Sequence, residues 1–119
     1  MKEITKKMVE QELIEIGVKP SFTGFAQLRD VIIECYNNED YIYKFIKGPL
    51  TIIAERYGKR PNVIERNIRG AIEKTFENCD PDRIYNYFGN TVDFNKAKLA
   101  NRDFVALVVL KLRWKYDET

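Results

Sequence analysis

The sequence predicts an all-α fold, a compact bundle of about six helices that contains a helix-turn-helix. Apolar residues recur at a spacing near 3.6 along most of the chain, and no long stretch alternates with period 2. Glycine and proline divide these stretches where helices are expected to begin or end. With 119 residues, 45% of them hydrophobic, the chain can bury one core, so residues 1–119 are expected to form a single domain.

Three helices are expected in the first part of the chain. The range 4–16 has apolar residues at helical spacing and is followed by Gly17, which suits a helix end. The range 24–37 has a longer apolar stripe. A third segment, about 40–47, is aromatic and is expected to stop before Pro49.

The most informative segment is a short helix over 50–57, a turn, and a longer helix over about 61–77. Gly58 tolerates the positive φ that such a turn needs, and Pro61 suits the first position of a helix. Ala54 is the small residue expected where the two helices cross. The apolar anchors on the inner faces are Ile53, Tyr57, Ile64 and Ile68.

Two more helices are expected near 81–88 and after Asn101. Asp80 and Asn101 are the candidate N-cap residues, since short polar side chains satisfy the free amides of a first turn. The range 89–100 between these helices is rich in asparagine and lysine and is expected to be a loop.

Composition excludes several classes of function. The chain has no histidine, and Cys35 and Cys79 lie far apart, so neither a zinc site nor a histidine-based catalytic triad is expected. Both cysteines are expected to be reduced structural thiols. No glycine-rich phosphate loop or nucleophile motif is present either. We therefore expect no enzyme, cofactor or metal.

The sequence also lacks membrane and secretion signals. No apolar run approaches the roughly 20 residues that span a bilayer. The charged N-terminus has no apolar stretch with a cleavage site, so a cytoplasmic protein without membrane contact is expected.

Charge is unevenly distributed although the net charge is only +2. The ranges 55–74 and 96–119 each carry six basic and three acidic residues, a net of +3, whereas residues 1–48 carry a net of −1. A local excess of this kind suits phosphate binding. Charge alone favours the alternative, an ordinary solvated face.

The helix over 61–77 separates its residues into two faces. At about 100° per residue, one arc is apolar and the opposite arc is polar. Arginine pairs with guanine, asparagine with adenine and glutamate with cytosine, and valine can contact a thymine methyl group. The same pattern also fits an amphipathic helix with solvated charges and a Glu65–Arg69 pair. The apolar arc contains Ile64, Ile68, Ala71, Ile72, Thr75 and Phe76, and the polar arc contains Asn62, Arg66, Arg69 and Glu73.

From about residue 13 to 113, the chain resembles the C-terminal effector domain of the sporulation-initiation response regulator, the stage-zero sporulation protein A family. The resemblance lies in four collinear stretches. The stretch IERNIRGAIE, residues 64–73, resembles the family's recognition helix, usually written VERAIRHAIE. The other three stretches are 16–18 with 24–29, 88–92 with 96–98, and 101–106 with 111–113.

The resemblance implies an all-helical domain that binds a short DNA box, often as a tandem pair, and activates or represses transcription. It implies base contacts from Glu65, Arg66 and Arg69 and backbone contacts from Lys96 and Lys98. In that family, the segment around the fifth helix also meets the polymerase sigma factor. The family's phosphoacceptor receiver domain has no counterpart among these 119 residues.

The sequence therefore predicts a sequence-specific transcriptional regulator that binds double-stranded DNA, with the helix over about 61–77 in the major groove. The family usually has arginine at the position of Val63, and this change motivates an alternative. The alternative is a protein-interaction module or decoy that keeps the fold without specific DNA binding. The expected base-reading residues are Asn62, Val63, Glu65, Arg66 and Arg69, the phosphate-binding residues are Lys59, Arg60, Lys96 and Lys98, and the candidate sigma-factor contacts are Asp82, Arg83 and Tyr85.

Overall fold

The computed structural model describes residues 3–78, 80–89 and 100–117. Within these ranges the chain forms six α-helices and no strand, which confirms the predicted all-α bundle. Two short helical turns, η1 (Glu39–Ile42) and η2 (Ile46–Leu50), lie between the second and third helices. The helices are α1 (Lys6–Ile16), α2 (Phe25–Asn37), α3 (Thr51–Tyr57), α4 (Pro61–Asn78), α5 (Pro81–Phe88) and α6 (Asn101–Tyr116).

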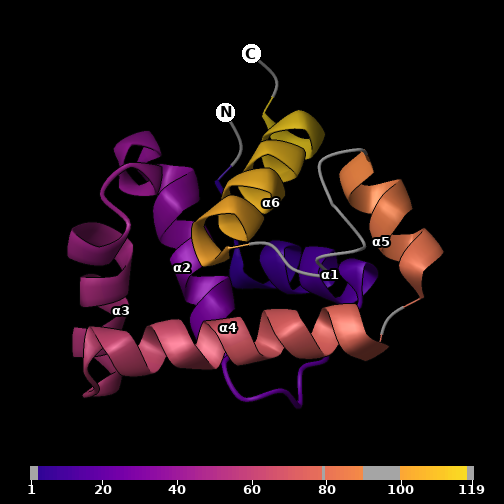
Figure 1. Ribbon diagram of the computed structural model, residues 1–119. Coiled ribbons are helices and arrows are strands. Elements are labelled where there is room, and N and C mark those ends of the chain that lie inside the picture. The colour runs from indigo at the N-terminus through magenta and orange to yellow at the C-terminus, as the bar shows by residue number, and fades with distance from the viewer. Residues whose placement is uncertain (1–2, 79, 90–99, 118–119) are drawn as a thin grey trace.

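Helix α4 runs along one side of the molecule, and the other helices lie above it in the view of Figure 1. Helix α2 contacts α1, α3, α4 and α6, so it is the central element of the bundle. Helix α6 begins beside α4 and runs away from it (Figure 1). Burial of each large apolar side chain contributes about 1.5–3 kcal/mol. Fully buried side chains include Leu13, Ile16, Leu28, Ile32, Ile53, Ile64, Ile68, Ile72, Phe104 and Leu112.

Two of the predicted helix ends are confirmed. Gly17 caps α1 with a φ of 118°, and its amide bonds to the carbonyls of Leu13 and Ile14. Asp80 caps α5, where its side chain accepts a hydrogen bond from the amide of Asp82 at 2.9 Å. Glycine and aspartate act here through local chemistry, which explains why the sequence was informative.

The prediction that Asn101 is an N-cap is wrong. Asn101 is the first residue of α6, and Ala100 precedes it as the cap without a side-chain hydrogen bond. The Asn101 amide nitrogen Nδ2 instead donates to the main-chain carbonyl oxygen of Glu65 at 2.9 Å. A tertiary contact with α4 has replaced the local one.

The prediction of a helix over 40–47 that stops before Pro49 is also wrong. That range holds the short η1, a turn and the start of η2, and η2 passes through Pro49 and continues directly into α3. Pro49 has no amide hydrogen to donate. The carbonyl of Phe45 accepts from the amide of Leu50 at 3.1 Å instead, so the wider π turn accommodates the proline.

A buried carboxylate joins α1, α5 and α6. Glu12 is only 3% exposed and accepts hydrogen bonds from Lys115 Nζ at 2.9 Å and from the Tyr87 hydroxyl. Burial, together with this hydrogen bond, raises the pKa of Tyr87 well above its usual range. The hydrogen bond to Glu12 also raises the pKa of Lys115. Because both pKa values are raised, Tyr87 and Lys115 keep the protons that they donate to the buried carboxylate of Glu12.

Cys35 is a buried free thiol on α2, as predicted, and burial with the nearby charge of Glu34 raises its pKa to about 12. Cys79 and most of the expected loop over 89–100 lie outside the described residues. No helix of the described part is both long and apolar enough to cross a membrane.

Gly24 is predicted to be essential for stability. Its φ is +97°, and a Cβ atom placed there would lie 2.3 Å from the main-chain oxygen of Asn67 in α4. Gly24→Ala should lower the free energy of unfolding by roughly 2–4 kcal/mol, because it adds both strain and overlap. Chemical denaturation measures the change.

Gly70→Ala is the matched control. Gly70 lies inside α4, and nothing lies within 4 Å of a Cβ atom placed there. Alanine should stabilise the protein by about 0.5–1 kcal/mol through helix propensity. Equal effects of the two substitutions would contradict the close approach at Gly24.

Candidate nucleic-acid interface

Helices α3 and α4 are joined by the three-residue turn Gly58, Lys59 and Arg60. Gly58 has a φ of 65°, the left-handed conformation that glycine adopts without strain. The amide of Lys59 bonds to the carbonyl of Ala54 at 2.8 Å, which closes the end of α3. The carbonyl of Arg60 accepts the amide of Val63 at 3.0 Å, and Pro61 begins α4 as predicted.

The inner faces of this pair are apolar. Ile53 and Ala54 of α3 and Ile64 and Ile68 of α4 are 0–1% exposed. Tyr57 is half-buried and packs against the same core. The four predicted anchors and the small residue Ala54 therefore hold the two helices together.

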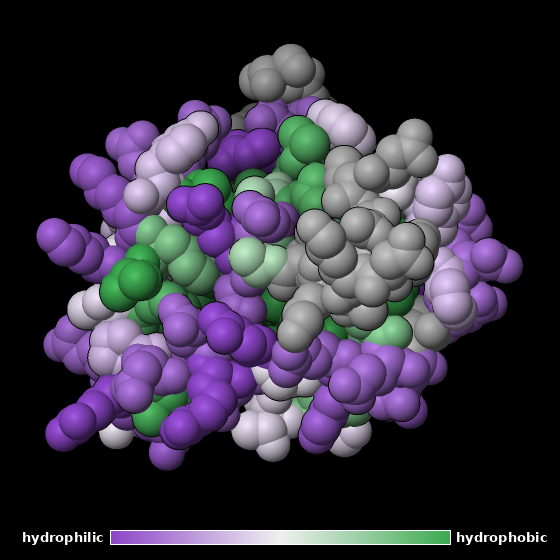
Figure 2. Space-filling model, viewed as in Figure 1, coloured by the Kyte–Doolittle hydropathy of each residue, from purple (hydrophilic) through white to green (hydrophobic). Residues whose placement is uncertain are grey.

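The outer side of the first half of α4 carries the predicted base-reading residues. We call Asn62, Val63, Glu65, Arg66 and Arg69 the reading face. Asn62, Arg66 and Arg69 are exposed, whereas Val63 and Glu65 are half-buried. Figure 2, viewed as in Figure 1, shows mainly hydrophilic side chains along the lower part of the molecule, where α4 lies.

The charges of the reading face are only weakly engaged. Arg69 Nη2 lies 3.6 Å from Glu65 Oε1, with the two side chains 59% and 38% exposed. An exposed pair of this spacing contributes only about 0.3–0.5 kcal/mol, so a stronger partner can displace it. Among the described residues, Arg66 forms no ion pair or hydrogen bond. Both guanidinium groups are accessible.

The predicted phosphate-binding residues are described only in part. Lys59 and Arg60 are exposed in the turn directly before α4. Their charges therefore flank the N-terminal end of the reading face. Lys96 and Lys98 lie outside the described residues.

A line of polar residues on α2 contacts both α3 and α4. Gln27, Asp30 and Glu34 are spaced by three and four residues, so they share one face of α2. We call these three residues the polar line. Gln27 accepts a hydrogen bond from Asn67 of α4 at 3.1 Å, and Glu34 pairs with Arg56 of α3 at 3.4 Å.

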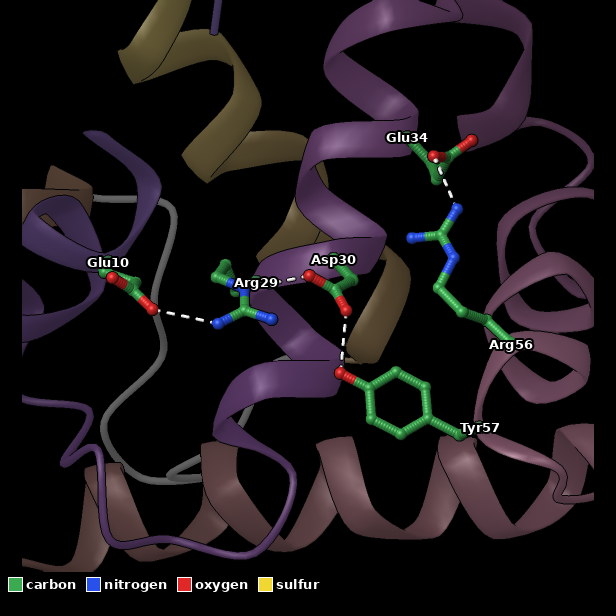
Figure 3. A network of polar contacts seen from close by, with 6 residues as sticks. All are labelled: Glu10, Arg29, Asp30, Glu34, Arg56 and Tyr57. Carbon is green, nitrogen blue, oxygen red and sulfur yellow. Dashed lines mark hydrogen bonds and ion pairs between the residues drawn. The ribbon is translucent and has the colours of Figure 1, made fainter. Parts of the chain in front are cut away.

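Asp30 is the centre of the polar line. It is 4% exposed, and it accepts hydrogen bonds from Arg29 Nε at 2.8 Å and from the Tyr57 hydroxyl at 2.7 Å. Arg29 also reaches Glu10 of α1 at 2.9 Å (Figure 3). Burial, and the hydrogen bond to Asp30, raise the pKa of Tyr57. The network thus connects α1, α2 and the last residue of α3.

The sequence interpretation missed this supporting network. It identified the apolar stripe of α2 but not the second, polar stripe beside it. The spacing of Gln27, Asp30 and Glu34 was a usable signal. Their partners were not readable, because Tyr57 and Asn67 lie 27 and 40 residues further along the chain.

The candidate sigma-factor contacts Asp82, Arg83 and Tyr85 are all exposed on α5. Asp82 and Arg83 also line an open groove of about 810 Å³ between α1, α5 and α6. Trp114 of α6, 68% exposed, lines the same groove. Leu110, also on α6, is 40% exposed.

No group of three or more carboxylate or thiol side chains in the described residues is arranged to hold a metal ion. The candidate site therefore consists of the short helix α3, the turn at Gly58 and the longer helix α4 with its exposed arginines. They place the chain among all-helical domains built around two helices joined by a tight turn. Within that class, the family model "Sporulation initiation factor Spo0A C terminal" matches residues 9–112.

The chain therefore belongs to the Spo0A C-terminal family, as the resemblance indicated. This is a family of DNA-binding effector domains that regulate transcription in sporulation, and not a family of enzymes. The match includes all of the reading face and most of α6.

Tyr57→Phe should remove the hydrogen bond that attaches α3 to Asp30 of α2. The substitution leaves the buried carboxylate of Asp30 without one of its two donors, at a cost of about 1–3 kcal/mol in unfolding free energy. Because the pKa of Tyr57 is raised in the folded state, its contribution is complete below about pH 10, the usual pKa, and is lost as pH rises above it. Denaturation at pH 7 and at pH 11 measures both effects.

Tyr43→Phe serves as the control, since Tyr43 is 83% exposed. It should leave the stability unchanged at pH 7. If Tyr57→Phe unfolds like the unsubstituted protein, the hydrogen bond to Asp30 does not support α3.

Proposed function

We propose that the protein is a sequence-specific transcriptional regulator that places α4 in the major groove of double-stranded DNA. The observation that carries the proposal is the exposure of Arg66 and Arg69 on the first half of α4. The N-terminal part of such a helix is the part that enters the groove. Membership of a family of DNA-binding effector domains supports the same mechanism.

The two arginines supply most of the base recognition in this proposal. They are three residues apart, about 4.5 Å along the helix axis, and project from the same side. Each guanidinium can donate two hydrogen bonds to O6 and N7 of a guanine. The weak pair with Glu65 orients Arg69 without occupying it fully.

The other members of the reading face refine the preference. Asn62 can pair with an adenine, Glu65 can accept from the amino group of a cytosine, and Val63 can contact a thymine methyl group. Val63 stands where the family usually has arginine, so the preferred box should contain one guanine contact fewer.

Phosphate contacts position the domain on the duplex. Lys59 and Arg60 are exposed beside the N-terminal end of α4 and can contact one strand. The loop lysines Lys96 and Lys98 are proposed for the same role. Such contacts supply affinity that depends on salt and carries no sequence information.

Further proposals concern the setting of this activity. Residues 1–119 act as one domain. Two copies bind the DNA side by side as a tandem homodimer, and the protein is located in the cytoplasm. Asp82, Arg83 and Tyr85 contact the sigma factor of RNA polymerase. Their exposure on α5, a helix separate from the reading face, supports a contact that is compatible with bound DNA.

The second candidate function is a protein-interaction module or decoy that keeps the fold without specific DNA binding. The observation in its favour is Val63, which removes one guanine-reading group. Fluorescence-anisotropy titration at two salt concentrations separates the candidates. A decoy binds every duplex weakly and with steep salt dependence.

Arg66→Ala should reduce sequence preference. We expect a loss of about 1–3 kcal/mol on the duplex that the unsubstituted protein selects from a random library, and little loss on a scrambled duplex. Lys59→Ala is the control for phosphate contacts. It should weaken both duplexes alike and reduce the salt slope by about one. Equal losses for Arg66→Ala on both duplexes would refute base reading by this residue.

Arg83→Ala should weaken binding to polymerase without changing DNA affinity. The measurement is the affinity of the labelled protein for isolated sigma factor, with the DNA titration in parallel. We expect a decrease of several-fold, typical of a partly exposed interface residue. Lys6→Ala, an exposed charge at the start of α1, is the control. If both variants bind sigma factor equally well, the contact lies elsewhere.

A further inference from the structure

We infer that Asn101 is a positioning residue for base recognition, acting on the reading face through the main-chain carbonyl of Glu65. The inference rests on the proposed function, since it assigns a role within the same DNA-binding site. Asn101 touches no proposed DNA-contacting side chain with its amide. It contacts the backbone of the helix that carries them.

The Asn101 amide forms its hydrogen bond with the first half of α4. Asn101 Nδ2 donates to the Glu65 carbonyl oxygen at 2.9 Å. In an α-helix that oxygen also accepts the amide of Arg69, and a carbonyl oxygen has two lone pairs to do so. The side chain of Asn101 is thus bonded to the turn of α4 that separates Arg66 from Arg69.

The same turn of α4 is also held by α2. Asn67 Nδ2 donates to Gln27 Oε1 of α2 at 3.1 Å. The backbone at Gly24 lies so close to Asn67 that even a Cβ atom would overlap its carbonyl oxygen. Residues 65–67 are therefore fixed from both α6 and the start of α2.

Apolar packing alone cannot fix this turn of α4. Ile64 and Ile68 are fully buried under the same turn, but their contacts are not directional. They permit small rotations of α4 about its axis. Hydrogen bonds depend steeply on angle, so those of Asn101 and Gln27 set the rotation. A bidentate arginine contact with guanine needs that rotation held within about 10–20°.

A contribution to stability alone explains Asn101 poorly. It is 6% exposed, and its Oδ1 atom is buried without a hydrogen-bond partner among the described residues. A buried polar atom without a partner is unfavourable, and an apolar side chain would avoid that cost. Because Nδ2 donates to the carbonyl of Glu65, Oδ1 is left as the unpaired end of the amide.

The test compares two duplexes, the one that the unsubstituted protein selects from a random library and a scrambled duplex of the same composition. The variants are Asn101→Ala, which removes the donor, and Asn101→Asp, which keeps the shape but presents only acceptors to the carbonyl. We expect each to lose at least about fivefold in affinity for the selected duplex. Affinity for the scrambled duplex and the salt slope should change less than about twofold.

Thr75→Val is the matched control. Thr75 is buried on the second half of α4, and its hydroxyl also donates to a helix carbonyl, that of Ala71, at 2.8 Å. This change should lower the melting temperature and leave the ratio of the two affinities unchanged. A specificity ratio that falls with Asn101→Ala but not with Thr75→Val supports positioning, because a purely structural role moves only the melting temperature.

Other results overturn the inference. One is an equal loss on both duplexes, and another is a lower melting temperature with an unchanged ratio. If the Asn101 variants do not fold, Asn67→Ala replaces them, since it removes the neighbouring bond to Gln27 from a half-buried position. An unchanged ratio there also refutes the fixed rotation. If the unsubstituted protein itself prefers no duplex, the proposed function fails, and this inference fails with it.

Discussion

The buried carboxylate of Asp30 is the interaction on which the placement of the reading face depends. A charge that is 4% exposed is tolerated only when donors surround it, and here the donors come from Arg29 and from Tyr57 of α3. Helix α3 has seven residues, too few to be stable alone. Its position therefore depends on the packing of its buried residues and on this bond to α2, and the turn that follows it fixes where α4 begins.

Helix α4 has a different role on each side. On its outer side Arg69 has one weak partner, and Arg66 has none among the described residues, so these exposed side chains are available to a ligand. Its inner side is held by buried isoleucines and by directional bonds from Gln27 and Asn101. Rigid support behind exposed charged groups suits recognition, because the backbone that carries them does not have to be ordered on binding.

The sequence predicted the helices well wherever local chemistry decides them. The bounds of α2 and α4 lie within about two residues of the expected ones. Gly17, Gly58 and Asp80 end or begin helices as expected, since each acts through its own backbone or side chain. The prediction was wrong at Asn101, where a hydrogen bond to a distant part of the chain overrode the local signal. It was also wrong at 40–47, where a local π turn carries the helix through Pro49.

The sequence by itself determined which face of α4 is polar, because the helical repeat places Arg66 and Arg69 opposite Ile64 and Ile68 whatever else the chain does. It also determined the family. Only the tertiary structure decided what holds that face in place. The bonds that do so join residues 27 to 40 positions apart, as in Tyr57–Asp30 and Asn101–Glu65. Their partners depend on how whole helices pack, and a repeat within one helix carries no information about that.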